Sequence, residues 1–234
     1  IGVTATDSST LGAYELESVA EITASSGTAS AAAATSALTT ALADAADYTV
    51  KGSFGSATVK VDAGADARDV AKSFNLSAGT TGINATAITK ASITGLGKAT
   101  TISFTLQGKS TSASTVNATV DSTSNLTALK DAINSVSGAT GISASLTTDL
   151  SGINLVQQDG YDIVIGDVTT THVSGTMTVK VADKSGTAQG TEQTLKGFTT
   201  ADDSVAMVGQ VSLSSHKAFT VTPGNAANHF ATTA

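Results

Sequence analysis

The chain has no cysteine, no tryptophan and few basic residues, and these shortages exclude several classes of function. Without cysteine there is no disulfide, no thiolate metal ligand and no thiol nucleophile. With 12 Lys and Arg against 19 Asp and Glu, the net charge is -7, so the chain lacks the basic surface that binds nucleic acid or anionic lipid. We therefore expect neither nucleic acid nor a membrane as a partner.

A long apolar run is also missing. Residues 1–20 have neither the basic start nor the unbroken apolar stretch of a cleaved signal peptide, and no window reaches the ~18 apolar residues of a membrane span. We therefore expect a cytoplasmic protein, a protein that is exported by a route without a cleaved signal, or an excised fragment of a longer protein. The start at Ile1 rather than Met favours the fragment.

Hydroxyl side chains are abundant. Ser and Thr make up 69 of the 234 residues, whereas only 13% are charged, so hydroxyl groups solvate the surface. The chain is 40% hydrophobic, with six Phe and three Tyr, so its core must consist of Ala, Val, Ile and Leu. Small and β-branched side chains favour thin sheets. We therefore expect an α+β fold, mainly β, in which small sheets are each crossed by a short helix, with no long helical rod.

The most informative pattern is an internal repeat. Corresponding residues of its two copies, such as Phe74 and Ile133, are always 59 residues apart. The first copy comprises Ala57–Val61, Ala67–Asn75 and Gly79–Ala85, and the second comprises Val116–Val120, Leu126–Asn134 and Gly138–Ala144. An offset that is kept through three elements indicates a duplicated unit rather than low complexity.

Each copy predicts a strand, a short helix and a second strand. Alternating apolar residues such as Val116, Ala118 and Val120 are typical of a strand with one buried face, and the apolar residues that follow recur at helical spacing. These helical stripes are Ala67, Val70 and Phe74 in the first copy, and Leu126, Leu129, Ile133 and Val136 in the second. We expect the helices to begin at Asp66 and at Ser124 or Asn125, and to end at Gly79 and Gly138.

Further elements are predicted around the repeat. A hairpin is expected from Gly152–Val156 and Tyr161–Ile165, with Asp159-Gly160 as its turn. The run at 28–47 is rich in Ala, which predicts either a helix carrying Leu38 and Leu42 or a mobile insert. Ile1–Ala5 matches the tail of the repeat unit. More strands are expected at 176–181, 191–198, 210–213 and 218–222.

No pattern points to catalysis, a cofactor or a metal. His172, His216 and His229 are far apart and have no partner at ligand spacing, and no Gly-x-Ser-x-Gly elbow is present. The acidic stretches Asp62–Asp66 and Asp159–Asp162 lack the ligand alternation of a calcium loop and are expected to be turns. The segments at 79–82 and 138–141 follow helices instead of opening them, unlike phosphate loops.

The second copy resembles the repeat in the variable central part of bacterial flagellins. That repeat pairs an Ile-Asn at the end of a helix with a Thr-Gly-Val-Thr-Ala that opens a strand, as Leu129–Asn134 and Ser137–Ala144 do here, and continues like Gly152–Val156 and Gly160–Ile165. The resemblance covers about residues 48–166 well and 205–234 weakly. Similar repeats occur in filament cap and hook–filament junction proteins, which are the less favoured identities.

The resemblance implies a structural, non-enzymatic component of the flagellar filament that contributes to its surface, antigenicity and motility. It implies an extracellular location and export without a cleaved signal peptide. The implied partners are other flagellin subunits, through rod regions that this sequence does not include, together with host surfaces or antibodies.

Two other classes of function remain alternatives. An adhesin or carbohydrate-binding module requires an exposed aromatic platform, but Tyr14, Tyr48 and Tyr161 are scattered in the sequence. An inserted enzyme would have to be a metal-dependent hydrolase.

We expect two subdomains. The inner one is formed by residues 1–98 and 200–234, with the first repeat at about 48–96. The distal one is inserted at 99–199, with the second repeat at about 107–166.

Overall fold

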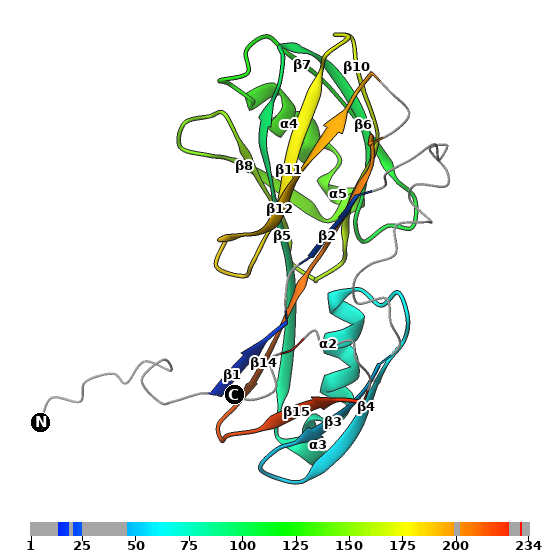
Figure 1. Cartoon of the computed structure of the whole chain (residues 1–234), viewed down its shortest axis with the longest axis vertical. Coiled ribbons are helices and arrows are strands. Elements are labelled where there is room, and N and C mark those ends of the chain that lie inside the picture. The colour runs from blue at the N-terminus through cyan, green and yellow to red at the C-terminus, as the bar shows by residue number, and fades with distance from the viewer. Residues whose placement is uncertain (1–13, 19–20, 25–45, 199–201, 225–229, 231–234) are drawn as a thin grey trace, which may run out of the picture.

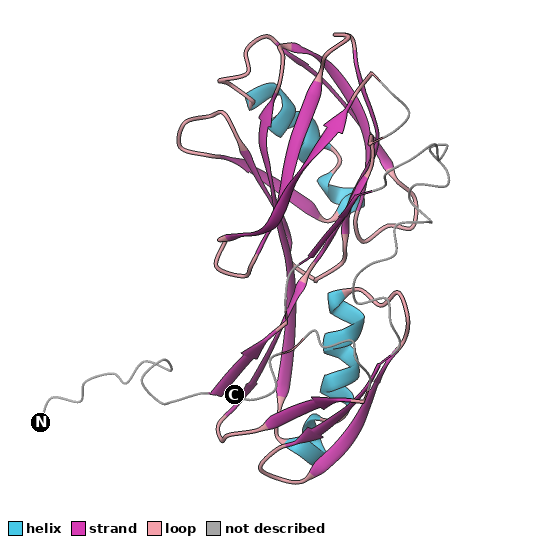
Figure 2. Cartoon of the chain, in the orientation of Figure 1, coloured by secondary structure: helices cyan, strands magenta, loops and turns pink. Residues whose placement is uncertain are grey.

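The computed structural model describes residues 14–18, 21–24, 46–198, 202–224 and 230, which form an elongated molecule (Figure 1). Strands predominate in this part of the chain, and its four helices are short (Figure 2). All strand pairs are antiparallel, in sheets of seven, five and three strands. The expected mainly β, α+β class is therefore confirmed, with no long helical rod among the described residues.

The first repeat consists of a hairpin, two short helices in succession and a long strand. Its elements are β3 (Ala46–Lys51), β4 (Ser56–Val61), α2 (Ala67–Leu76), α3 (Ala78–Thr81) and β5 (Asn84–Leu96). The apolar stripe of α2 is buried, as its spacing predicted. The hairpin pairs with β15 (Thr220–Pro223) in the three-stranded sheet, and α2 packs between β4 on one side and β5 with β14 on the other.

The second repeat has the same order of elements. They are β6 (Thr100–Gln107), β7 (Ser114–Val120), α4 (Thr127–Ser135), α5 (Ser137–Thr140) and β8 (Ile142–Leu146). Here α4 packs against β7 and β8. The repeated unit is thus larger than its sequence pattern predicted, because each copy opens with a hairpin rather than with a single strand.

The remaining strands complete the two larger sheets. They are β1 (Tyr14–Glu17), β2 (Glu21–Ala24), β9 (Ile153–Gln157), β10 (Ile163–Thr170), β11 (Thr176–Ala182), β12 (Ala188–Lys196), β13 (Val205–Val208) and β14 (Gln210–Ser215). The five-stranded sheet has the order β2-β13-β10-β6-β7. In the seven-stranded sheet the order is β1-β14-β5-β11-β12, with β9 also pairing with β5 and β8 with β9.

The buried apolar side chains form two separate cores. The first surrounds α2 and includes Tyr48, Phe74 and Phe230, whose ring centroids are 5.5–5.7 Å apart. The second surrounds α4 and takes its residues from 91–207. Strand β5 contributes Ala85 to the first core and Ile93 to the second, and it runs from the lower half of Figure 1 into the upper half. The subdomain boundaries given above remain a prediction.

The structure contradicts two local expectations. No hairpin joins β9 and β10, because β9 pairs with β5 and β8 whereas β10 pairs with β6 and β13 in another sheet. The helices do not end at Gly79 and Gly138 either, since both glycines lie inside the short helices α3 and α5. Ile1–Ala5 lies outside the described residues, as does the Ala-rich run up to residue 45, while Ala46 and Asp47 open β3.

Candidate functional site

The joint between helix and strand is built from equivalent residues in the two repeats. Each short helix ends at a glycine in the left-handed region, with φ of 74° at Gly82 and 71° at Gly141. A residue with a side chain is strained in this conformation, whereas glycine is not. The amide of each glycine donates a 2.7 Å hydrogen bond to the carbonyl four residues earlier, of Ala78 and Ser137 respectively. These two glycines, and not Gly79 and Gly138, are the helix terminators.

An asparagine at the end of the preceding helix holds the strand that follows. Nδ2 of Asn134 donates to the carbonyl of Ala144 at 2.9 Å, and Oδ1 accepts from the amide of the same residue at 2.8 Å. Asn75 makes the same pair of bonds with Ala85, both at 2.8 Å. The planar amide therefore satisfies both backbone groups of one residue, as a neighbouring strand would do.

A buried threonine fixes the turn between them. Oγ1 of Thr140 donates to the carbonyl of Val136 at 3.1 Å and accepts from the amide of Ile142 at 3.2 Å. In the first repeat, Thr81 makes the equivalent bonds with Ser77 and Ile83, at 2.9 and 3.3 Å. Both threonines are buried, so their hydroxyl groups are satisfied within the turn instead of by water.

A further glycine, not found from the sequence, lets the hairpin approach this turn. A Cβ atom on Gly108 would lie 2.3 Å from the carbonyl oxygen of Thr140, and one on Gly52 would lie 1.9 Å from that of Thr81. Both positions therefore require glycine. They escaped the repeat search because they are 56 rather than 59 residues apart, since the two hairpin loops differ in length.

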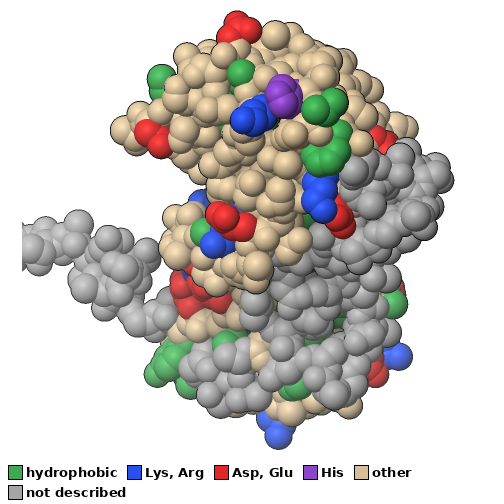
Figure 3. Space-filling model, turned by 45° about the horizontal axis from the view of Figure 1, so that its top comes forward, with side chains coloured by type: hydrophobic (Ala, Val, Ile, Leu, Met, Phe, Trp, Pro, Cys, Tyr) green, Lys and Arg blue, Asp and Glu red, His purple; other side chains and the backbone are tan. Residues whose placement is uncertain are grey.

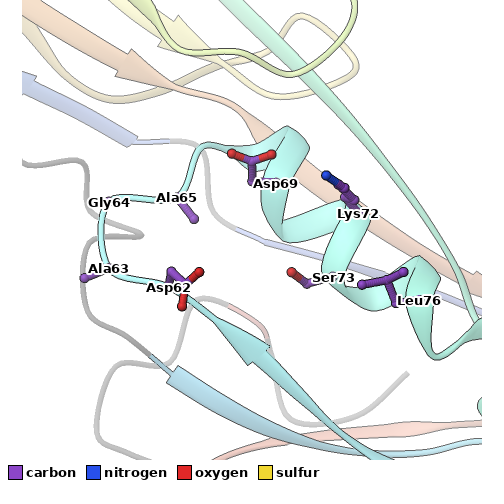
Figure 4. Close-up of a pocket in the computed structure, with 8 residues that line it drawn as sticks. All are labelled: Asp62, Ala63, Gly64, Ala65, Asp69, Lys72, Ser73 and Leu76. Carbon is purple, nitrogen blue, oxygen red and sulfur yellow. The ribbon is translucent and has the colours of Figure 1, made fainter.

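Each repeat also forms a shallow groove between its hairpin and its helix. The groove of the first repeat, about 460 Å³, is lined by the turn at 62–65 and by one face of α2, with Asp62 and Ser73 facing each other across it (Figure 4). The groove of the second repeat, about 390 Å³, lies between Asp121 and Asp131. Asp62 and Asp121 are equivalent residues, but Lys72 of the first groove corresponds to Asp131 in the second. The shape is repeated and the charge is not.

The predicted helix starts are largely confirmed. Oδ1 of Asp66 accepts from the amide of Asp69 at 2.8 Å, which is the N-cap bond expected for α2. For α4, Leu126 occupies the cap position, but Oδ1 of Asn125 accepts from the amide of Thr127 at 3.1 Å. Asn125 rather than Ser124 therefore satisfies the start of the second helix.

Among the described residues, neither the histidines His172 and His216 nor the tyrosines come together into a site. The ring of His172 accepts a hydrogen bond from the amide of Ser174, His216 lines a small groove near Phe54, and His229 lies outside the described residues. Tyr48 is buried in the first core, whereas Tyr14 and Tyr161 lie on different segments. The described part of the chain contains no group of three His, Cys, Asp or Glu that could hold a metal ion.

The described surface is polar and sparsely charged. The described part of the face drawn in Figure 3 consists mostly of backbone and uncharged polar side chains, among which the charged groups are scattered. Of the helices described, none has the length and apolar character needed to cross a membrane.

Comparison with known proteins finds a family that matches the second repeat. Residues 101–159 match the family model described as the flagellin hook IN motif. No curated protein matches the chain. Among solved structures, the chain is similar to the flagellar cap protein FliD from Helicobacter pylori, with 12% identity over 91% of this chain and 78% of that chain. The TM-score of 0.24 is too low to define a common fold.

The matched segment begins in the β6–β7 hairpin, contains α4 and α5 with Asn134, Thr140 and Gly141, and ends just after β9. The expected resemblance to the flagellin repeat is therefore confirmed over this stretch, since residues 101–159 match the flagellin hook IN motif.

Proposed function

We propose that the chain is an outward-facing, non-enzymatic part of a flagellar structural protein, with the flagellar filament as its place of assembly. The match of residues 101–159 to the flagellin hook IN motif carries this proposal. The first repeat supports it, because its asparagine, threonine and two glycines make the same contacts as those of the matched repeat.

The chemistry of the surface supports a location at the outside of the filament. Hydroxyl side chains cover the surface of a chain that has few charges. The grooves of the two repeats have only one equivalent charged residue in common, Asp62 in the first and Asp121 in the second. The role we propose is therefore to form and present a surface, and its direct partners are other flagellar subunits. Contacts with antibodies or host surfaces would be made by the same exposed face.

Labelling of intact cells tests this assignment. Fab fragments raised against the purified 234-residue chain and coupled to gold are expected to decorate the flagellum along the length of the filament. Gold confined to the filament tip would assign the chain to the cap instead, and gold at the base of the filament would assign it to the hook–filament junction. Absence of gold from the flagellum, with the protein detected elsewhere in the cell, would refute the proposal.

The adhesin alternative has its own test. The purified chain is expected to show no specific binding on a glycan array, because the three tyrosines do not form a platform. Specific micromolar binding that is lost on exchange of an exposed aromatic residue such as Tyr14 would replace the structural role by a carbohydrate-binding one.

A further inference from the structure

The two cores meet at a seam that is formed by the N-terminus of α2, the middle of β5 and the loop between β9 and β10. The amide of Arg68 in α2 donates to the carbonyl of Gly160 in this loop at 3.1 Å. The Arg68 guanidinium lies 4.7 Å from the centre of the Tyr161 ring. A Cβ atom on Gly160 would lie 2.4 Å from that of Ala87 in β5. The loop of the second core is thus held closely between a helix and a strand of the first.

Polar atoms without partners concentrate at this seam. Among the described residues, three buried side-chain atoms have no hydrogen-bond partner: Oγ1 of Thr89, Nε2 of Gln157 and Oδ1 of Asp162. Thr89 and Gln157 face each other across β5 and β9, and Oε1 of Gln157 accepts from the amide of Tyr161. Most buried polar groups in folded proteins are satisfied, so such a concentration marks a functional or strained place.

The Asp162 carboxyl is the titratable group of this set. Its burial, and to a smaller extent the nearby Asp66 carboxylate, together raise the pKa to about 8. The other charged or titratable groups on the segments that meet here are Arg68 and Asp69 of α2, Lys90 of β5, and Asp159 and Tyr161 of the loop. No bond from any of them to Asp162 is found, so an ionised carboxylate here would be buried without a partner and next to a like charge.

A second contact between the cores does not involve Asp162. Lys184, in the turn between β11 and β12, pairs with Glu15 at 2.9 Å and with Glu17 in β1. Its backbone amide donates to Oε1 of Gln210 at 2.8 Å, and Nε2 of Gln210 donates to the carbonyl of Ser18 at 2.7 Å. These bonds join the second core to the first independently of the loop, so release of the loop leaves the two cores connected.

We propose that the seam is a proton-dependent latch: with the Asp162 carboxyl protonated the loop stays docked on α2, and loss of that proton to solvent releases the loop and frees the two cores to move about β5. Ionisation makes the docked position unfavourable, because the carboxylate is then buried near Asp66. When the loop leaves the seam, the carboxylate is solvated by water and lies farther from Asp66. The Lys184 contact and β5 then act as the hinge.

Distance measurements between two spin labels test the latch in the full chain. Because the sequence has no cysteine, the exchanges Ala63→Cys and Thr123→Cys introduce one exposed label site beside each core without competing thiols. Double electron–electron resonance is expected to give a narrow distance distribution at pH 6 and a broad or shifted one at pH 9.5. The change should be complete by about pH 8, the Asp162 pKa in the docked state, because above it the carboxyl is ionised whether the loop is docked or released. An unchanged distribution over this range would overturn the proposal.

Three variants separate the latch from a general effect of alkali. Asp162→Asn is expected to keep the narrow distribution at both pH values, whereas Asp159→Asn, an exposed carboxylate of the same loop, is expected to behave as the unmodified chain does. Asp66→Asn keeps an N-cap side chain but removes the charge that disfavours the docked carboxylate, so the loop should open less at pH 9.5 than in the unmodified chain. This variant decides the matter if Asp162→Asn does not fold. An Asp162→Asn chain that still opens, or an Asp66→Asn chain that opens as fully as the unmodified one, would contradict the latch.

Discussion

Asn75 and Asn134 each supply the donor and the acceptor that a paired strand would offer to one residue of the following strand. In the second repeat this strand is β8, which among the described strands pairs only with β9, so Asn134 covers part of the edge that these strands leave open. An open edge is where strands of other chains add on. The asparagine therefore holds the helix against the strand. It also occupies backbone amide and carbonyl groups of the strand that could otherwise pair with a strand of another chain.

Truncation of this side chain tests that role. Asn134→Ala is expected to lower the free energy of unfolding by about 1–3 kcal/mol, because the amide and carbonyl of Ala144 both lose their partner. Denaturant unfolding measures the loss. Asn117→Ala is the matched control, since Asn117 is exposed on β7, and should change the stability by less than about 0.5 kcal/mol. Equal effects of the two exchanges would show that Asn134 has no special role.

Whereas Asn134 stabilises the folded chain, Asp162 destabilises it at neutral pH. Its folded-state pKa of about 8 lies above the ordinary value of 3.8, so the folded chain holds a proton that the unfolded chain releases. The contribution of this group to stability is full below pH 3.8 and declines as the pH rises towards 8. Asp162→Asn should therefore raise the free energy of unfolding by at least about 1 kcal/mol at pH 7 and leave it unchanged near pH 3.5.

Denaturant unfolding at the two pH values measures this difference. A gain of the same size at both would mean that the asparagine stabilises through a new hydrogen bond and not through the missing charge. A loss at pH 7 would show that the ionised carboxylate has a stabilising partner.

At the scale of elements, the turn between helix and strand depends on the glycine of the hairpin that packs on it. Gly108→Ala is expected to destabilise the chain by about 1–3 kcal/mol, because the new methyl group would lie 2.3 Å from the carbonyl oxygen of Thr140. Gly138→Ala, inside α5, meets nothing within 4 Å and should be neutral or stabilise by up to about 1 kcal/mol. Thermal unfolding of the two variants side by side checks the difference, and a harmless Gly108→Ala would refute the close approach.

The elements that the sequence predicted well are those set by local periodicity. The stripe of Ala67, Val70 and Phe74 predicted the buried face of α2, and Asp66 predicted its start, because spacing and capping are both local properties. The hairpin expected around Asp159-Gly160 was wrong, although Gly160 does adopt a turn conformation with φ of 81°. A turn signal shows that the chain bends, but not which sheet the next strand joins. That choice depends on distant partners such as β6 and β13.

The candidate site was predictable only in part for a similar reason. Asn75, Asn134, Gly82 and Gly141 belong to the 59-residue repeat, so their equivalence could be seen in the sequence. Gly52 and Gly108 could not be paired in this way, because the hairpin loops have different lengths. The seam was missed altogether, since Asp66 and the loop that carries Asp162 come near each other only when the two cores pack together.

At the scale of the whole molecule, two similar units are joined into one elongated body by a strand that belongs to both cores (Figure 1). The termini of the described part, at β1 and Phe230, lie close together, since Ser18 next to β1 bridges to Phe230. A segment that leaves and returns at one place suits an outward projection that leaves the assembly beneath it intact. This arrangement is the physical basis of the proposed surface role.

The proposed surface role is tested most directly by cryo-electron microscopy of filaments from the native cell after in-frame deletion of the codons for residues 46–224. Because the two repeats are proposed to project outward, the account predicts filaments with an unchanged inner lattice and a smaller outer diameter than those with the complete chain. Filaments that keep their full diameter, or cells that no longer make filaments at all, would contradict it.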